Sequence, residues 1–279
     1  MKNLQGKVAV ITGGAEGIGK GIAVRAATEG MKLVLADINA ARLEATVAEF
    51  KAQGCAVIGV PTDVAREEQV NALAEQAFAK FGKVHLLVNN AGVAVAKPAW
   101  ETSQKDWDWV MGVNFYGVTH ALRAFVPTML KHGEDGHIVN TASMAGLTSQ
   151  PSLSSYNASK HAVVTVSEGL HHDLALRQSR IKVSVLCPGW VKTGIGHSER
   201  NRDGDKQAPA AIDPVAAKVG MAVLHAVENG IPVSQVADEV FAAIAAERFY
   251  ILTHPEMKQA IQVRMEDILQ QRAPTLLKI

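Results

Sequence analysis

Short apolar runs alternate with helix-forming segments along the chain, and this alternation restricts the fold more than any other feature. Runs of strand length fall near residues 7–12, 32–37, 56–60, 85–89, 137–141, 182–187 and 249–252. Apolar residues at helical spacing occupy the segments between them, including one long region at 103–131. Strands joined in this way pair in parallel and are covered by helices on both faces. The prediction is an α/β fold with a doubly wound, seven-stranded parallel sheet.

Length and charge limit the class of protein. The 279 residues, 48% of them hydrophobic, are enough for one large core, so a single domain is expected. A net charge of +1, evenly spread, gives no basis for binding nucleic acid or an anionic membrane. Cys55 and Cys187 lie in apolar runs, as reduced thiols do, and Met1 to Gly6 lacks the apolar core of a signal peptide. We expect a cytoplasmic protein whose partner is a small molecule.

The first strand ends in a glycine-rich turn, Thr12-Gly13-Gly14-Ala15-Glu16-Gly17-Ile18-Gly19, before a helix. Glycines permit positive φ and close backbone approach, so N–H groups at the helix N-terminus can face a pyrophosphate. A P-loop explains this stretch less well, because Gly21 stands where that motif needs a hydroxyl for magnesium. The turn therefore favours dinucleotide binding by a Rossmann-type sheet.

Asp37 ends the second strand, 18 residues after Gly19, where a dinucleotide fold places the acid that holds the adenosine ribose. A carboxylate there accepts from both ribose hydroxyls of NAD, whereas the 2′-phosphate of NADP brings like charge against it. Arg42 is the only nearby cation that could offset this repulsion, and the glycine turn carries Glu16. NAD is therefore the predicted cofactor.

The predicted strands are followed by polar or glycine residues that a parallel sheet brings to one edge. These residues are Gly13, Asp37, Asp63, Asn90, Ser143 and Pro188. Ligands of doubly wound sheets bind beyond the carboxyl ends of the strands. We therefore expect the functional site at this edge.

Tyr156 and Lys160 are four residues apart, so both side chains lie on one face of a helix. An ammonium beside a phenol favours the phenolate and lowers the pKa of the tyrosine. Tyr156 is the candidate base that takes the proton of an alcohol while a nicotinamide takes the hydride. Ser143 can donate a hydrogen bond to the substrate oxygen. The expected reaction interconverts an alcohol and a ketone.

These residues belong to a longer set of motifs. The set is Thr12-Gly13-x-x-x-Gly17-Ile18-Gly19, Asp63-Val64, Asn89-Asn90-Ala91-Gly92, Asn114, Ser143, Tyr156-x-x-x-Lys160 and Pro188-Gly189-x-x-x-Thr193. With these motifs in this order, the chain from Lys7 to about Thr193 resembles the short-chain dehydrogenase/reductase family. The resemblance implies a catalytic tetrad of Asn114, Ser143, Tyr156 and Lys160. It also implies a local break in the helix at Asn114, where the amide positions a water linked to Lys160.

The resemblance also implies the cofactor site. Asp63 and Val64 are expected near adenine, Asn90 near the adenosine ribose, and Val191 with Thr193 near the nicotinamide carboxamide. The implied cofactor residues are Gly13, Glu16, Gly17, Ile18, Gly19, Asp37, Asp63, Val64, Asn90, Ala91, Gly92, Tyr156, Lys160, Pro188, Gly189, Val191 and Thr193. Residues 1–193 are then the cofactor-binding and catalytic core of the single domain, and 194–279 hold the substrate loop, the last strand and the C-terminal helices.

The residues expected beside the substrate are mostly apolar. They are Val93, Val95, Ser143, Met144, Leu147, Trp190 and Ile195. Such a pocket binds by apolar burial with few polar anchors, which predicts a bulky apolar secondary alcohol or ketone, with aromatic ones as candidates. Segments 106–114 and 250–256 also resemble those of bacterial family members, the lignin aryl-ether Cα-dehydrogenases, that oxidise a benzylic alcohol. The alternatives are a polar pocket, a hydroxysteroid or general carbonyl reductase, and a non-catalytic dinucleotide-binding sensor or scaffold.

The remaining segments give weaker expectations. Asp213-Pro214 predicts a helix start, 234–247 a second helix, and the stripe Met257, Ile261, Met265 and Ile268 an extra C-terminal helix. Ser198 to Lys206 is a charged loop and a candidate substrate lid.

Two further expectations concern assembly and metals. The apolar stripe Val163, Val166, Leu170 and Leu174 predicts a homodimer through the long helices, with a homotetramer as the alternative. The histidines and cysteines show no metal-binding spacing, so no metal site is expected. No serine lies in a Gly-x-Ser-x-Gly elbow, which argues against an α/β hydrolase.

Overall fold

Seven parallel strands form one sheet in the computed structural model, which describes residues 1, 3–202 and 213–276. The strands are β1 (Val8–Thr12), β2 (Lys32–Asp37), β3 (Val57–Pro61), β4 (Leu86–Asn89), β5 (Gly136–Thr141), β6 (Ile181–Cys187) and β7 (Tyr250–Leu252). Their order is β3-β2-β1-β4-β5-β6-β7, and each neighbouring pair is parallel. The predicted doubly wound sheet is confirmed.

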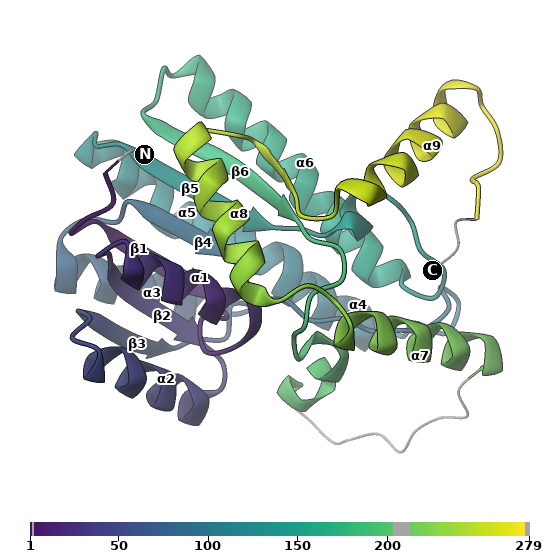
Figure 1. The fold of residues 1–279 in the computed structure, drawn as a ribbon, viewed down its shortest axis with the longest axis horizontal. Helices are drawn as coiled ribbons and strands as arrows, with labels where there is room; N and C mark the ends of the chain where they lie inside the picture. The colour runs from purple at the N-terminus through teal and green to yellow at the C-terminus, as the bar shows by residue number, and fades with distance from the viewer. Residues whose placement is uncertain (2, 203–212, 277–279) are drawn as a thin grey trace.

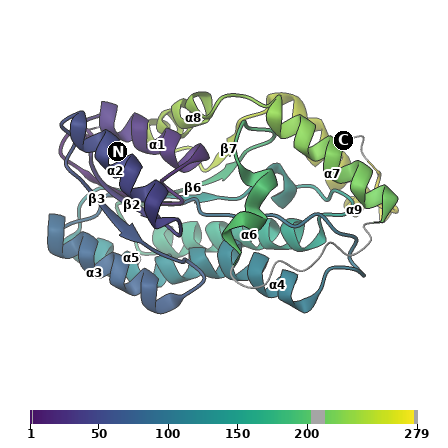
Figure 2. The same ribbon diagram turned by 90° about the horizontal axis from the view of Figure 1, so that it is seen from below.

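Helices cover both faces of this sheet (Figures 1 and 2). They are α1 (Gly17–Thr28), α2 (Ala40–Ala52), α3 (Glu67–Phe81), α4 (Gln104–Met111), α5 (Gly117–His132), α6 (Ser154–Leu176), α7 (Pro214–Glu228), α8 (Val233–Ala246) and α9 (Lys258–Leu269). Figure 2 shows α1, α2 and α8 on one face and α3, α5 and α6 on the other. The extra C-terminal helix, α9, is present, and none of the helices described is long and apolar enough to cross a membrane.

Strand β1 shows why the sheet has a core on each face. Ala9 and Ile11 are buried in the core that includes α1 and α8, whereas Val8 and Val10 are buried in the core that includes α3 and α5. Successive side chains of a strand point to opposite faces, so a strand covered on both sides must be apolar throughout. The alternation of apolar runs and helices in the sequence follows from this requirement.

The strand order reverses at β1, and this reversal locates the site. From β1 the chain moves outward to β2 and β3, and then crosses back to β4 on the other side of β1. The connections after β1 and β4 leave toward opposite faces, which opens a crevice at the carboxyl ends of these strands. Gly13 and Asn90 directly follow the two strands.

The helical region predicted at 103–131 is interrupted. Five residues, Gly112–Tyr116, form a π-helical turn between α4 and α5. The residue after this turn, Gly117, packs closely against the loop after β3. A Cβ at Gly117 would lie only 2.7 Å from Cγ2 of Val64 in that loop. A π turn adds one residue to a helical turn and is frequent at functional sites. Here it carries Asn114, which is 1% exposed, so the local break expected at this residue is present.

Two apolar stripes behave differently from each other. Val163 and Leu174 of α6 are buried in the chain's own cores, and Val166 and Leu170 pack against these cores, so the stripe faces the sheet. A homodimer through the long helices stays a prediction, and other faces of these helices would have to carry it. On α9, Ile261 packs against the core, whereas Met265 and Ile268 are 45% and 53% exposed.

His137 in β5 provides a test of the buried sheet. Its side chain is 0% exposed, its Nε2 lies 2.8 Å from Ser184 Oγ, and burial lowers its pKa to about 3. The Ser184 hydroxyl donates to Arg248 O, so it accepts from Nε2–H, and the imidazole is neutral. Because the unfolded chain takes up a proton near pH 6.5 and the folded chain does not, stability falls as pH falls from about 6.5 to about 3.

We expect His137→Gln to remove part of this acid sensitivity, because an amide can keep the donor to Ser184 without titrating. Urea unfolding at about pH 8 and about pH 5 measures the free energy of unfolding at each pH. Between these values the wild type should lose up to about 1.4 kcal/mol more of this free energy per pH unit than the variant. His172→Gln, at an exposed histidine, is the matched control and should follow the wild type. Identical acid dependence of His137→Gln and wild type would contradict the buried neutral imidazole.

Candidate active site

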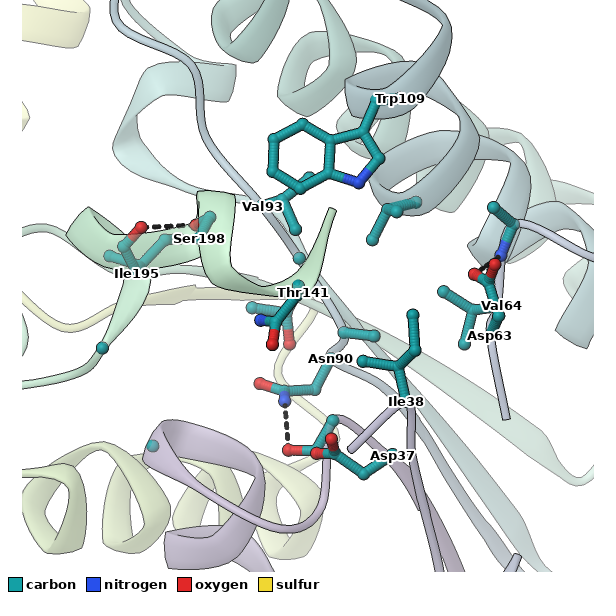
Figure 3. Close-up of a pocket in the computed structure, with 18 of the residues that line it drawn as sticks. Asp37, Ile38, Asp63, Val64, Asn90, Val93, Trp109, Thr141, Ile195 and Ser198 are labelled. Atoms are coloured by element: carbon teal, nitrogen blue, oxygen red, sulfur yellow. Dashed lines mark hydrogen bonds between the residues drawn. The ribbon is translucent and has the colours of Figure 1, made fainter. Parts of the chain in front are cut away.

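A cavity of about 570 Å³ lies at the predicted edge of the sheet (Figure 3). Figure 3 shows Asn90 between Asp37 and Thr141, with Trp109 at the far end of the cavity from Asp37. The cofactor residues expected from the sequence that line it are Gly13, Glu16, Gly17, Ile18, Asp37, Asp63, Val64, Asn90, Ala91, Gly92, Tyr156, Lys160, Pro188 and Thr193. The fold therefore brings loops from both halves of the sheet to one space.

Three residues expected at the cofactor do not line this cavity. Gly189 and Val191 line a second cavity beside it. Gly19 lies behind the glycine turn, where a Cβ would be 2.1 Å from Gly13 O. The lack of a side chain at Gly19 lets α1 pack against the end of β1.

The glycine turn is held by side chains from β1 and from the loop after β4. Asn90 Nδ2 donates to Thr12 O at 3.0 Å and to Gly13 O at 3.3 Å, while Thr12 Oγ1 accepts from the backbone N–H of Asn90 at 2.9 Å. Gly13 and Gly17 have φ of 62° and 55°, the left-handed region that favours glycine. Glu16 makes no side-chain cap on α1, so the first N–H groups of the helix remain available to an anion at the cavity.

Asp37 is fixed by backbone donors at the end of β2. Its Oδ2 accepts from Ala15 N–H at 3.2 Å and its Oδ1 from Asn39 N–H at 3.0 Å. Burial raises the pKa of Asp37, and these two hydrogen bonds oppose the rise. Each oxygen keeps a free lone pair, so the carboxylate can accept from two further hydroxyls.

A second acid at this end pairs with both nearby cations. Glu16 Oε1 forms an ion pair with Arg42 Nη1 at 2.9 Å and also contacts the guanidinium of Arg200. Arg42, which the sequence offered as the one cation for a 2′-phosphate, is therefore engaged by Glu16. Arg200 was not predicted, because it lies far from Glu16 in the chain and only the fold brings the two together.

Tyr156 and Lys160 lie on one face of α6 as predicted, but their electrostatics differ from the expectation. Lys160 Nζ donates to Thr141 O at 2.9 Å and lies 5.6 Å from the centre of the Tyr156 ring. Burial raises the pKa of Tyr156, and the nearby Ser143 hydroxyl opposes the rise. The lowering expected from Lys160 is not seen in this structure, because the ammonium points to the Thr141 carbonyl and burial of the phenol sets the direction of the shift.

Asn114 is held from several directions. Its Nδ2 donates to Val93 O at 3.0 Å and to Ser159 Oγ at 2.9 Å, and its Oδ1 accepts from Val93 N–H at 2.8 Å. A Cβ at Gly92 would lie 3.4 Å from both Asn114 Oδ1 and Lys160 Nζ. Gly92 thus separates these two polar atoms, and its lack of a side chain keeps the space between them open.

A second cavity, of about 120 Å³, adjoins the first and is mostly apolar. Tyr156, Pro188, Thr193, Ile18 and Ile195 line both cavities. Of the residues expected beside the substrate, Ser143, Met144, Trp190 and Ile195 line this second cavity, together with Val223, Val227 and Met257 from the C-terminal region. The C-terminal residues were identified only through the fold.

Val95 and Leu147 occupy other positions. Val95 is buried in a small cluster with Val93 and Val110 of α4, and Leu147 packs against the core near α6. Neither residue lines either of the two cavities. Val95 was expected beside the substrate, but its side chain packs against Val110 of α4 in this cluster.

The segment 195–202 is fastened to both walls of the larger cavity. Arg200 contacts Glu16 on one wall. On the other wall, Arg202 donates to Asp106 at 2.8 Å and its guanidinium lies 4.9 Å from the centre of the Trp109 ring. Burial by itself would raise the pKa of Asp106, but donors from Lys97, Arg202 and Ser103 outweigh it and hold the pKa below its ordinary value. The rest of the candidate lid, residues 203–206, lies outside the described residues.

The site contains a phenol, an ammonium and a hydroxyl between a polar groove and an apolar cavity. Such a set can move a proton and bind an oxygen that gains negative charge. In the described part of the chain no group of three or more His, Cys, Asp or Glu side chains is arranged to hold a metal ion.

Comparisons with known proteins agree with this geometry. A family model described as short chain dehydrogenase matches residues 7–204. A "CLA biosynthesis dehydrogenase/reductase" of Lactiplantibacillus plantarum is 38% identical over 98% of this chain and 97% of its own length. A "C alpha-dehydrogenase" of a Sphingobium species is 32% identical over 98% and 89%. The crystal structure of a short chain dehydrogenase/reductase from Burkholderia phymatum in complex with NAD is 48% identical, covers 100% of both chains and has a TM-score of 0.96.

The buried ammonium gives a prediction that does not depend on activity. Burial lowers the pKa of Lys160 to about 8. We expect one lysine signal to titrate near this value in carbon NMR of protein labelled at lysine Cε, and Lys160→Met to remove that signal. Lys51→Met, at an exposed lysine, is the control and should remove a different one. A Lys160 midpoint near the ordinary value of about 10.4 would contradict the burial of the ammonium.

Proposed function

The chain belongs to the short chain dehydrogenase family, and from this premise we propose that it is an NAD-dependent oxidoreductase that interconverts an apolar secondary alcohol and its ketone. The observation that carries the proposal is the position of Tyr156, which lines both the polar groove and the apolar cavity. A base at that boundary can act on a substrate in one cavity while a nucleotide occupies the other. We further propose a single domain with its cofactor-binding and catalytic core at 1–193.

NAD supplies the hydride acceptor, and the residues that fit it are on the groove. The first turn of α1 offers backbone N–H groups to phosphate, and Asp37 keeps free lone pairs for ribose hydroxyls. The absence of a side chain at Gly92 leaves room next to Lys160. The groove of about 570 Å³ is in the range of cofactor sites.

In the proposed mechanism Tyr156 takes the proton of the substrate hydroxyl, and Ser143 donates a hydrogen bond to the same oxygen as it becomes negative. Burial opposes ionisation of the phenol, so the reaction needs a positive charge near it. Lys160 supplies that charge while it is protonated. With a pKa of about 8, it is mostly charged at neutral pH and loses this role as pH rises above about 8.

Asn114 is a positioning residue in this scheme. Its side chain joins the π turn to the loop after β4 and, through Ser159, to α6, which carries Tyr156 and Lys160. These hydrogen bonds hold three catalytic elements at fixed separation. A π turn at this place therefore sets the geometry of the proton donors and acceptors.

The second cavity supports the apolar substrate. Its lining is dominated by Met144, Leu153, Trp190, Val223 and Met257, with few polar groups besides Ser143 and Tyr156. Two relatives are named a dehydrogenase/reductase of CLA biosynthesis and a C alpha-dehydrogenase, which supports the interconversion of an alcohol and a ketone. Hydroxysteroid or general carbonyl reduction is the alternative within the family, and a non-catalytic dinucleotide sensor is the alternative outside it. Homodimer formation and a cytoplasmic location stay predictions.

We expect NAD to be preferred over NADP by at least about tenfold in kcat/KM, or about 1.4 kcal/mol. Asp37 repels the 2′-phosphate, and Glu16 already pairs with Arg42, the cation that could bind it. Steady-state kinetics with both cofactors measures the ratio. Glu16→Gln removes the ion pair with Arg42 and should reduce the ratio of kcat/KM with NAD to kcat/KM with NADP. Lys51→Gln, on the exposed surface, should leave this ratio unchanged. Equal efficiencies in the wild type would contradict the assignment.

A substrate panel tests the proposed function directly. With NAD, 1-arylalkanols should be oxidised faster than polyols, followed by absorbance of the reduced cofactor. Tyr156→Phe should remove nearly all turnover and leave NAD affinity within about a few-fold, since it deletes only the acidic hydroxyl. If polyols are oxidised rapidly while 1-arylalkanols and hydroxysteroids are not oxidised, the proposal of an apolar substrate pocket is wrong. Full turnover by Tyr156→Phe would show that the base is another residue.

A further inference from the structure

We propose that His254 is a positioning residue for the Pro188–Gly189–Trp190 segment. His254 lies two residues after the end of β7 and acts by accepting a hydrogen bond from the backbone N–H of Gly189. Pro188 lines both cavities, and Gly189 and Trp190 line the apolar one, so the position of this segment affects how a substrate there meets the nicotinamide end of the cofactor. The inference rests on the proposed function for its kinetic consequences. It does not depend on which alcohol is the substrate.

The hydrogen bonds of His254 hold two consecutive residues of the segment. Its Nδ1 lies 3.2 Å from the Gly189 backbone N, and its Nε2 lies 3.1 Å from Trp190 O. The side chain is 7% exposed, so it competes little with water for these partners. A histidine that bridges a backbone donor and a backbone acceptor fixes both the position and the orientation of the peptide between them.

These partners determine the tautomer. The Gly189 N–H can only donate, so Nδ1 must be an unprotonated acceptor, and Trp190 O can only accept, so Nε2 must carry the proton. Thr253 Oγ1 lies 2.8 Å from the same Nδ1, so the single lone pair of that nitrogen is shared between the Gly189 N–H and the threonine hydroxyl. The neutral imidazole protonated at Nε2 satisfies all three contacts.

The two backbone bonds are not equivalent. Trp190 O also accepts from Ile231 N–H at 3.0 Å, so it keeps a partner if Nε2 is lost. For the Gly189 N–H, His254 Nδ1 is the partner that the described residues supply. The acceptor atom of His254 is therefore the one whose loss leaves a polar group unsatisfied.

Close packing supports the same contact. A Cβ at Gly189 would lie 2.8 Å from Cγ of His254 and 2.6 Å from the sulfur of Met257. The imidazole therefore lies directly against the backbone of Gly189, and no larger residue fits between them. Met257 also lines the apolar cavity, so this packing joins the C-terminal region to the substrate side of the segment.

The other side of the segment is attached to the residues beside the reacting oxygen. Pro188 O accepts from Met144 N–H at 2.9 Å and from Ser143 Oγ at 3.4 Å. His254 and Ser143 thus hold the same short stretch from opposite ends. A shift of the Gly189 peptide would move both the Ser143 hydroxyl and the residues up to Thr193 that line the groove.

Three substitutions separate the acceptor from the donor. His254→Asn places an amide oxygen near the position of Nδ1 and keeps an acceptor for Gly189. His254→Gln reaches the position of Nε2 and keeps only the donor to Trp190, while His254→Ala removes both. Thr253→Val is the matched control, because it deletes a neighbouring hydrogen bond to Nδ1 without changing the imidazole.

The affinities for NAD and for ADP-ribose, measured by isothermal titration calorimetry, test the proposal without turnover. ADP-ribose lacks the nicotinamide, so its affinity should stay within about twofold in all variants, whereas NAD should bind about tenfold more weakly to His254→Ala and His254→Gln. His254→Asn and Thr253→Val should stay close to the wild type. In steady-state kinetics with the best 1-arylalkanol, kcat should fall in His254→Ala and His254→Gln and stay close to the wild-type value in His254→Asn and Thr253→Val.

Three results would overturn the proposal. The first is equal weakening of NAD and ADP-ribose binding by His254→Ala, which would indicate general damage to the fold. The second is wild-type NAD affinity in His254→Gln but not in His254→Asn. The third is a loss of NAD affinity in Thr253→Val as large as in His254→Ala. A wild type that binds NAD but oxidises no alcohol would count against the proposed function alone, because the comparison of the two ligands would still report on His254.

Discussion

The reversal of strand order at β1 is the constraint on which the rest of the structure depends. A central parallel strand is buried on both faces, so β1 and β4 carry apolar side chains along their length and leave polar groups for their carboxyl ends. The connections from these two strands leave in opposite directions, and the crevice between them is where Asn90 can bond to Thr12 and Gly13. Both cavities lie along this edge.

Helix α6 must place a charged and a phenolic side chain at that edge, and buried polar groups hold it there. Asn89 Nδ2 donates to Asn140 Oδ1 at 2.8 Å, and Asn140 Nδ2 donates to Ser167 Oγ at 3.0 Å. This chain of amides crosses from β4 through β5 to α6 inside the core. Hydrogen bonds in such surroundings are strong when satisfied and costly when broken, so they fix the register of the helix on the sheet. Lys160 and Tyr156 have perturbed pKa values because of the same burial.

The C-terminal region completes the site from the other side. Residues of α7 and of the turn before α9 supply apolar lining, and His254 holds the segment after β6. Arg200 and Arg202 fasten the segment 195–202 to Glu16, which lines the groove, and to the buried Asp106 of α4, the helix whose Trp109 lines the groove. Exposed ion pairs contribute little to stability. Asp106 is buried, so the loss of one of its cationic partners would leave a buried charge uncompensated. The same contacts therefore restrict how far the substrate segment can move.

Sequence by itself determined the parallel sheet, the glycine turn and the acid at Asp37, since each follows from local rules: strand periodicity, positive φ at glycine and spacing along one βαβ unit. It also placed Tyr156 and Lys160 on one helix face. The tertiary structure alone decided that Val163 and Leu174 face the chain's own core, that Val95 turns toward α4, and that Arg200 and His254 join the site. It also reversed the expected pKa direction of Tyr156. Burial and contacts between distant residues set these features, and neither can be read from spacing along the chain.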